Sequence, residues 1–226
     1  MAGASKGTKI KLCRLNELGT LGYDVRDITD AFDVDKTAAT WSPHAGFWKH
    51  DADEVRTITQ EPNATLIART KALPGRKLKD ATTVWSKAGK TLLVSRLRTN
   101  THRLIATGYD KEVLGNTWWA FNDSKLSVNQ RKALLLWFNS TLGVMSYYGR
   151  RAITEGAWMQ MKKPAWASMQ VIDVRELSKE KLTELGKAYD ALAKKELSAI
   201  AALDVESDGS ETPCCTSIRE WPTNIA

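Results

Sequence analysis

Basic and aromatic residues alternate with glycines over a short span near residue 150. The order is Gly149-Arg150-Arg151, then Gly156-Ala157-Trp158, then Lys162-Lys163-Pro164. Arginine donates several N–H groups in a fixed fork, lysine neutralises phosphate, and tryptophan offers a flat ring on which a base can stack. A packed element that aims such a loop is typical of modules that bind a polyanion. The candidate binding residues here are Arg150, Arg151, Trp158, Lys162 and Lys163.

A second basic stretch runs from Arg69 to Arg103. It holds ten Lys or Arg residues and one acid, whereas the segment from Glu17 to Glu61 holds ten acids and four bases. Such a charged surface repels itself unless something neutralises it, which favours an anionic partner over a merely solvated face. The candidate binding residues in this stretch are Arg69, Arg76, Lys77, Arg96, Arg98, His102 and Arg103.

The chain contains nine Trp residues and four Phe. Trp118 and Trp119 are adjacent, so on a strand one ring faces each side of the sheet. Arg96 and Arg98 are two residues apart and would share one face. We expect the two Trp residues and the two arginines to provide stacking and bidentate donors, with core packing for each Trp and surface solubility for the arginines as the alternatives.

Motifs for catalysis and for metal binding are missing from the sequence. His44, His50 and Asp51 or Asp53 do not have the spacing of a known metal site, and 24–35 does not match a calcium loop. The sequence has no G-x-G-x-x-G or G-x-S-x-G motif and no nuclease cluster. We therefore expect no enzymatic activity and no metal site in this chain.

Composition bounds the class of protein. The net charge of +7 and the pI of about 9.3 favour nucleic acid or an anionic membrane surface. The three cysteines, Cys13, Cys214 and Cys215, have no C-x-x-C spacing, so we expect free thiols and a cytoplasmic protein. The longest apolar run, at 133–138, is too short to span a bilayer.

The periodicity predicts one α+β domain over 10–203: a mixed β-sheet, a buried central helix and a C-terminal amphipathic helix. We expect strands at 91–98, 102–109 and 113–122 with a hairpin turn at Asp110-Lys111, and a solvated turn region at 24–35. The helices are expected at 128–142, capped by Ser127, and from Ser178 to Leu203. Residues 1–9 are expected to be a flexible lead-in and 204–226 a disordered acidic tail.

Several of these segments together resemble a known family. The run LLLWFNSTLG at 134–143 precedes Arg150-Arg151, the 156–158 Gly-Ala-Trp, Lys162-Lys163-Pro164 and the VIDVR of 171–175. This order is similar to the C-terminal target-recognition region of N6-adenine DNA methyltransferases, in bacterial Type II and IIG restriction-modification enzymes and related phage-defence methylases. Segments 26–32, 85–90, 93–103 and 114–119 are similar to the same region, so the resemblance spans roughly 10–203.

The resemblance implies a sequence-specific module for double-stranded DNA, with no cofactor of its own. The F-x-G-x-G and [DNS]-P-P-[YFW] motifs, with which the family binds S-adenosylmethionine and the target adenine, are absent. S-adenosylmethionine is therefore expected on a separate methyltransferase partner, docked through the C-terminal helix, and no membrane contact is expected. The alternatives are a basic interaction protein that binds RNA or an acidic partner, and a non-functional methylase remnant.

Overall fold

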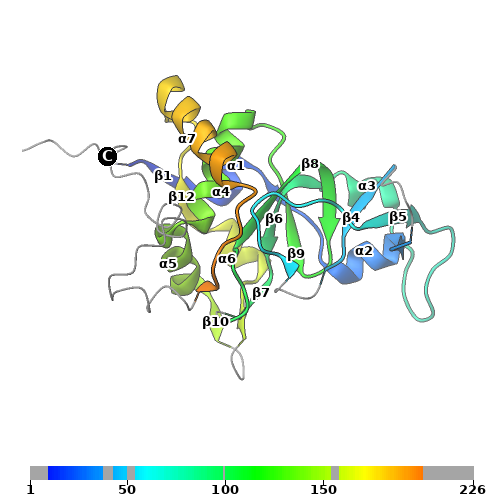
Figure 1. Cartoon of the computed structure of the whole chain (residues 1–226). Helices are drawn as coiled ribbons and strands as arrows, with labels where there is room; N and C mark the ends of the chain where they lie inside the picture. The colour runs from blue at the N-terminus through cyan, green and yellow to red at the C-terminus, as the bar shows by residue number, and fades with distance from the viewer. Residues whose placement is uncertain (1–9, 38–42, 50–53, 99, 154–157, 201–226) are drawn as a thin grey trace, which may run out of the picture.

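A curled seven-stranded sheet of mixed direction forms the centre of the computed structural model (Figure 1). The structure describes residues 10–37, 43–49, 54–98, 100–153 and 158–200. In spatial order the strands are β2 (Thr20–Leu21), β9 (Trp118–Asn122), β6 (Gly89–Val94), β8 (Ala106–Gly115), β4 (Ala45–Phe47), β5 (Ala64–Ala68) and β3 (Phe32–Asp35). β4 and β8 pair in parallel and the other neighbours are antiparallel, so the fold is α+β, as expected.

Two smaller sheets flank the main one. The pair β1 (Leu12–Arg14) and β12 (Gln170–Ile172) joins the beginning of the described chain to its later part. The second small sheet has the order β10 (Ala152–Ile153), β11 (Met159–Gln160) and β7 (Arg96–Leu97). β7 follows β6 after one residue, so this three-stranded sheet continues from the end of an inner strand of the central sheet.

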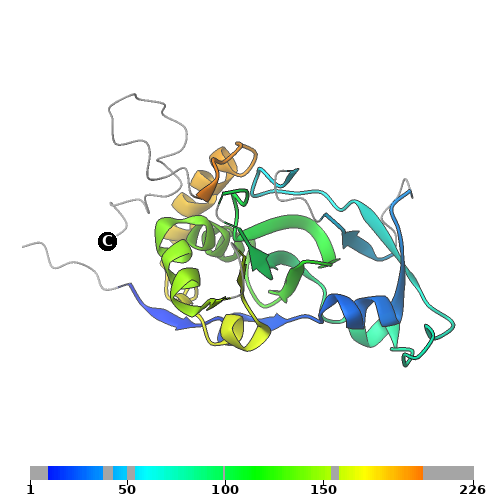
Figure 2. The same ribbon diagram turned by 90° about the horizontal axis from the view of Figure 1, so that it is seen from below.

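The helices gather at two ends of the main sheet (Figures 1 and 2). α4 (Val128–Asn139), α5 (Thr141–Arg150) and α7 (Lys179–Leu192) lie at one end, and α2 (Val25–Ala31) and α3 (Ala81–Trp85) at the other. The short helices α1 (Leu15–Leu18) and α6 (Lys163–Ala167) complete the set of described helices. None of the helices in the described ranges is long and apolar enough to cross a membrane.

α4 is the buried central helix that the sequence predicts. Ser127 and Gln130 form a capping box at its start, and residues 133–139 are buried in succession. The helix ends at Asn139, before the expected Leu142, because Ser140 accepts the backbone N–H of Gly143 and begins α5. A continuous helix to Leu142 is therefore wrong, and a sharp corner stands in its place.

The hairpin turn expected at Asp110-Lys111 is also wrong. β8 runs straight through these residues, which are exposed in the middle of the strand. The register between β6 and β8 shifts after Gly89, so the pairing is irregular beside this polar segment. The polar residues mark an exposed stretch of a long strand, which local turn signals do not distinguish from a hairpin.

Two further boundaries differ from expectation. The 24–35 segment is not a solvated turn: Asp24 caps α2 by accepting the N–H of Asp27, and β3 follows directly. The C-terminal helix begins after Ser178 as expected but ends at Leu192, and the chain continues without helix to the buried Ile200. The lead-in at 1–9 and the tail at 204–226 lie outside the described residues.

Candidate nucleic-acid interface

The three-stranded sheet presents one polar face. Arg96 of β7 pairs in register with Gln160 of β11, and directly paired residues of neighbouring strands point to the same side. Leu97 lies between Arg96 and Arg98 along the chain and is fully buried, so it turns its side chain to the core. Arg96 is exposed and Gln160 half-buried, so an arginine and an amide stand side by side on the outer face.

The same face continues to Arg98 and Trp158. The guanidinium carbon of Arg98 lies 5.1 Å from the centre of the Trp158 ring, a cation–π contact. His102 meets the edge of that ring at 6.0 Å between centroids and is itself buried, where its Nδ1 accepts the backbone N–H of Arg98. Trp158 stays 40% exposed, so Arg98 and His102 hold an accessible aromatic ring in place.

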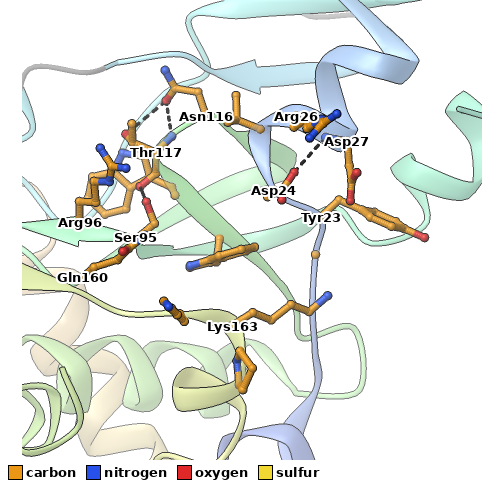
Figure 3. Close-up of a pocket in the computed structure, with 16 residues that line it drawn as sticks. Tyr23, Asp24, Arg26, Asp27, Ser95, Arg96, Asn116, Thr117, Gln160 and Lys163 are labelled. Carbon is orange, nitrogen blue, oxygen red and sulfur yellow. Dashed lines mark hydrogen bonds between the residues drawn. The ribbon is translucent and has the colours of Figure 1, made fainter. Parts of the chain in front are cut away.

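A cleft of about 790 Å³ opens beside Arg96 and Gln160, between the start of α2 and the ends of β7, β9 and β11 (Figure 3). Tyr23, Asp24, Arg26 and Asp27 stand on one side of it. Arg96, Gln160, Ser95, Asn116 and Thr117 stand on the opposite side, and Lys163 lies below them in the view. The other lining residues are Gly22, Val25, Trp118, Trp119, Lys162 and Pro164.

Four cations surround this cleft: Arg26, Arg96, Lys162 and Lys163. All four are exposed, and within the described ranges none of them forms an ion pair with a carboxylate. The Lys163 Nζ lies 5.8 Å from the centre of the Tyr23 ring. Their charge is therefore available to an anion that approaches the mouth of the cleft.

The two tryptophans of the cleft differ in what they can offer. Trp118 is 95% buried and packs edge-on against Phe47, which contradicts the expectation of an open stacking ring at this position. Trp119 is half-buried, and its Nε1 donates to the carbonyl oxygen of Met161 at 3.1 Å. Because the N–H is occupied, Trp119 can contribute its ring surface but no further donor.

The first part of the basic stretch has a different role from the one expected. Arg69 binds Asp33 at 2.6 Å, Arg76 binds the buried Asp30 at 2.5 Å, and Lys79 binds Asp27. The acidic segment at 24–33 therefore neutralises these three cations inside the molecule. Arg69 and Arg76 connect β5 and the following turn to α2 and are not free for DNA, which corrects their place among the candidate residues.

Other expected contacts lie apart from the cleft. Lys77 is exposed but is not part of its lining, and Arg103 donates to the carbonyl oxygen of Leu197. His102 is 93% buried, so its expected contact with DNA is wrong. At the end of α5, Arg150 donates to Ser168 Oγ at 3.1 Å, and Arg151, just after the helix, lies over the Tyr148 ring at 4.9 Å.

The side of the cleft at the start of α2 was not predicted from the sequence. Tyr23, Asp24 and Arg26 line it because α2 begins there, and the segment was expected to be a solvated turn. An Asp before a run with helical spacing of apolar residues is an N-cap signal that predicts this helix start. Gln160 lies beside Arg96 only because of the register between β7 and β11, and Asn116 lies between β8 and β9 on the same side of the cleft.

The Asn-Ser-x-x-Gly part of the 134–143 segment has a structural role. Asn139 is buried at the α4–α5 corner, where its Oδ1 accepts the N–H groups of Ile105 and Ala106 and its Nδ2 donates to the carbonyls of Ala106 and Leu135. A side chain on Gly143 would collide with the Trp137 carbonyl oxygen. The Asn-Ser-x-x-Gly pattern at 139–143 therefore locks a helix corner to β8.

α7 uses its apolar side within the domain. Leu185, Gly186 and Tyr189 are buried, and Gly186 lies close against Asn129 of α4. The outward side carries Lys179, Glu180, Thr183, Glu184 and Lys187. The helix therefore offers a charged face, and no apolar stripe, to any partner that would dock on it.

The sequence predicts no metal site at His44, His50 and a nearby Asp. His44 packs edge-on against Phe32 and Trp85, while His50, Asp51 and Asp53 lie outside the described residues. Within the described ranges no group of three His, Cys, Asp or Glu residues could hold a metal ion.

The chain matches no protein-family model, and no curated protein is significantly similar to it.

Proposed function

We propose that this chain recognises double-stranded DNA in a sequence-specific manner on behalf of a separate N6-adenine methyltransferase. The observation that carries the proposal is the convergence of Arg96 and Gln160, side by side on β7 and β11, with the exposed Lys162 and Lys163. These residues come from the two basic stretches of the sequence. The resemblance of the ordered segments at 134–175 to target-recognition regions supports the same class.

Each of these side chains suits a different part of the duplex. Arginine binds the O6 and N7 acceptors of guanine in the major groove, and glutamine binds N6 and N7 of adenine. Lysines contact phosphates, which positions the protein but does not read sequence. A narrow β-sheet that carries Arg96 and Gln160 on its outer face can enter the major groove, while Lys162 and Lys163 grip the adjacent backbone.

The proposed partner supplies S-adenosylmethionine and the catalytic loop. The apolar stripe of α7 is buried against α4, so a partner that docks on this helix would contact its charged outer side. Interfaces of this kind depend on ionic strength more than apolar ones do. The pairing therefore belongs to the transient, polar class of interfaces and not to the obligate class.

The experiment begins with selection of bound duplexes from a random library, followed by affinity measurements on the selected sequence and on a scrambled one. We expect the double variant Arg96→Ala/Lys163→Ala to lose affinity for the selected duplex by about 100-fold at moderate salt. The control Lys187→Ala removes an exposed cation from the outer face of α7 and leaves affinity unchanged.

Two results would contradict the proposal. One is equal affinity of the double variant and the unmodified protein for the selected duplex. The other is equal binding of RNA and of DNA of any sequence, which would favour a general basic interaction protein.

A further inference from the structure

We infer that the cleft beside Arg96 receives one unpaired base of the bound DNA. The base would lie against Trp119, with Asp24 at one edge and Arg96 and Gln160 at the other. The inference rests on the proposed function: Lys162 and Lys163 hold the backbone at the mouth of the cleft, and Arg96 and Gln160 bind the unpaired base in place of a paired one.

The size of the cleft decides what part of a DNA strand can enter. Its volume of about 790 Å³ lies in the range of small-molecule sites, roughly 300–1,000 Å³. A duplex is far too wide for such a space, whereas one base turned out of the stack fits it. Arg26, Lys162 and Lys163 also line the cleft and are exposed, so they would contact the backbone of the same strand.

The charges inside the cleft argue against a phosphate as the bound group. Asp24 and Asp27 occupy one side, opposite Arg96 and Gln160 (Figure 3), and Asp27 is paired with Lys79. The Asp24 carboxylate repels a phosphate, but it accepts hydrogen bonds from the amino group of a base. Arginine and glutamine on the opposite side donate to ring nitrogens and carbonyl oxygens. The arrangement suits a neutral heterocycle with a donor edge and an acceptor edge.

Aromatic rings line the same space. Trp119 and Tyr23 are both half-buried, and Tyr23 has the Lys79 and Lys163 amino groups at 5.7 and 5.8 Å from its ring centre. Stacking on such a ring contributes about 1–3 kcal/mol per base and does not depend on which base is present. Selectivity must then come from the edges, and Asp24 favours a base with an exocyclic amino group over thymine.

The test compares four duplexes of the selected sequence: one fully paired, and three that carry one extra residue, which is an unpaired adenine, an unpaired thymine or an abasic residue. We expect the unmodified protein to bind the adenine bulge about tenfold more tightly than the abasic bulge. An unpaired thymine should give a smaller gain than adenine, because it lacks the amino group that Asp24 accepts.

A single substitution isolates the edge contact. Asp24 Oδ1 caps α2 by accepting the N–H of Asp27, and asparagine caps helices about as well as aspartate. Asp24→Asn therefore keeps the helix start but replaces the second carboxylate oxygen by an NH₂ donor, and the preference for adenine over thymine should disappear. The matched control is Asp80→Asn, the N-cap of α3 outside the cleft, which should keep the preference.

The outcomes separate this inference from the proposed function. No binding to any duplex would overturn the proposed function and this inference with it. Tight binding to the paired duplex, with equal affinity for the adenine and abasic bulges, would overturn only the inference. Competition by micromolar adenosine monophosphate would show that the cleft takes free nucleotides, and would overturn delivery of the base by the strand; we expect no competition at that concentration.

Discussion

Arg76 and Arg96 belong to the same basic stretch, yet they have opposite roles. Arg76 is three-quarters buried at its side chain, binds Asp30 and donates to the carbonyl oxygen of Arg26. Arg96 is exposed at the cleft and, within the described part of the chain, binds no carboxylate. A run of positive charge along the sequence therefore overstates the charge that is exposed to a partner, because an acidic segment elsewhere in the chain can neutralise part of it.

The largest expected effect concerns Arg76. Arg76→Met leaves the buried Asp30 without its cation, and we expect the free energy of unfolding to fall by about 2–3 kcal/mol, less than for a fully buried pair because Arg76 is partly exposed. Urea denaturation measures this loss. The DNA affinity of the folded variant should not change. If Arg76→Met lost DNA affinity but kept its stability, Arg76 would be a DNA contact like Arg96.

The second prediction sharpens the role of Arg96. Arg96→Lys keeps the charge but loses the planar pair of donors, so affinity for the selected duplex should fall by about tenfold while affinity for the scrambled duplex is kept. Equilibrium titration on both duplexes gives the two values. Arg14→Lys, on an exposed arginine outside the cleft, serves as the control. Equal losses on both duplexes would make Arg96 a phosphate contact.

The third prediction concerns the lysine pair at the start of α6. Lys162→Ala/Lys163→Ala should reduce the slope of log affinity against log salt by about 2, because each phosphate contact releases close to one counterion. Lys162 makes no side-chain cap to the helix, so stability should stay the same. The control Lys179→Ala/Lys187→Ala removes two charges from α7 instead. An equal drop in its salt slope would mean that the slope reports the net charge of the protein and not contacts at Lys162 and Lys163.

The smallest effect is expected at Lys77. It is exposed, lies in the basic stretch and is not part of the cleft lining. Lys77→Ala should change stability by less than about 0.5 kcal/mol and affinity by less than about twofold. A loss of DNA affinity as large as that of Lys162→Ala/Lys163→Ala would show that the DNA-binding surface extends to the turn at 73–77.

Parts of the cleft were predictable from the sequence because they depend on local composition. The basic residues Arg96, Lys162 and Lys163 stand out by type and by their neighbours. Asp24 caps the short helix α2 and Arg26 lies in its first turn, but the alternating acids of 24–35 led to the prediction of a solvated turn. Gln160 lies within the second basic span, but its place beside Arg96 follows from strand pairing across more than sixty residues.

Propensity, periodicity and charge are local properties, and they are enough to predict the α+β class, the buried helix after Ser127 and the two basic stretches. Which cations bind Asp27, Asp30 and Asp33, and which stay exposed at the cleft, depends on the tertiary fold. Burial also depends on the fold: Trp118 and Trp119 both border the cleft, but Trp118 is buried against Phe47 and Trp119 is only half-buried. These contacts form between segments that are far apart in the sequence, so local sequence patterns do not predict them.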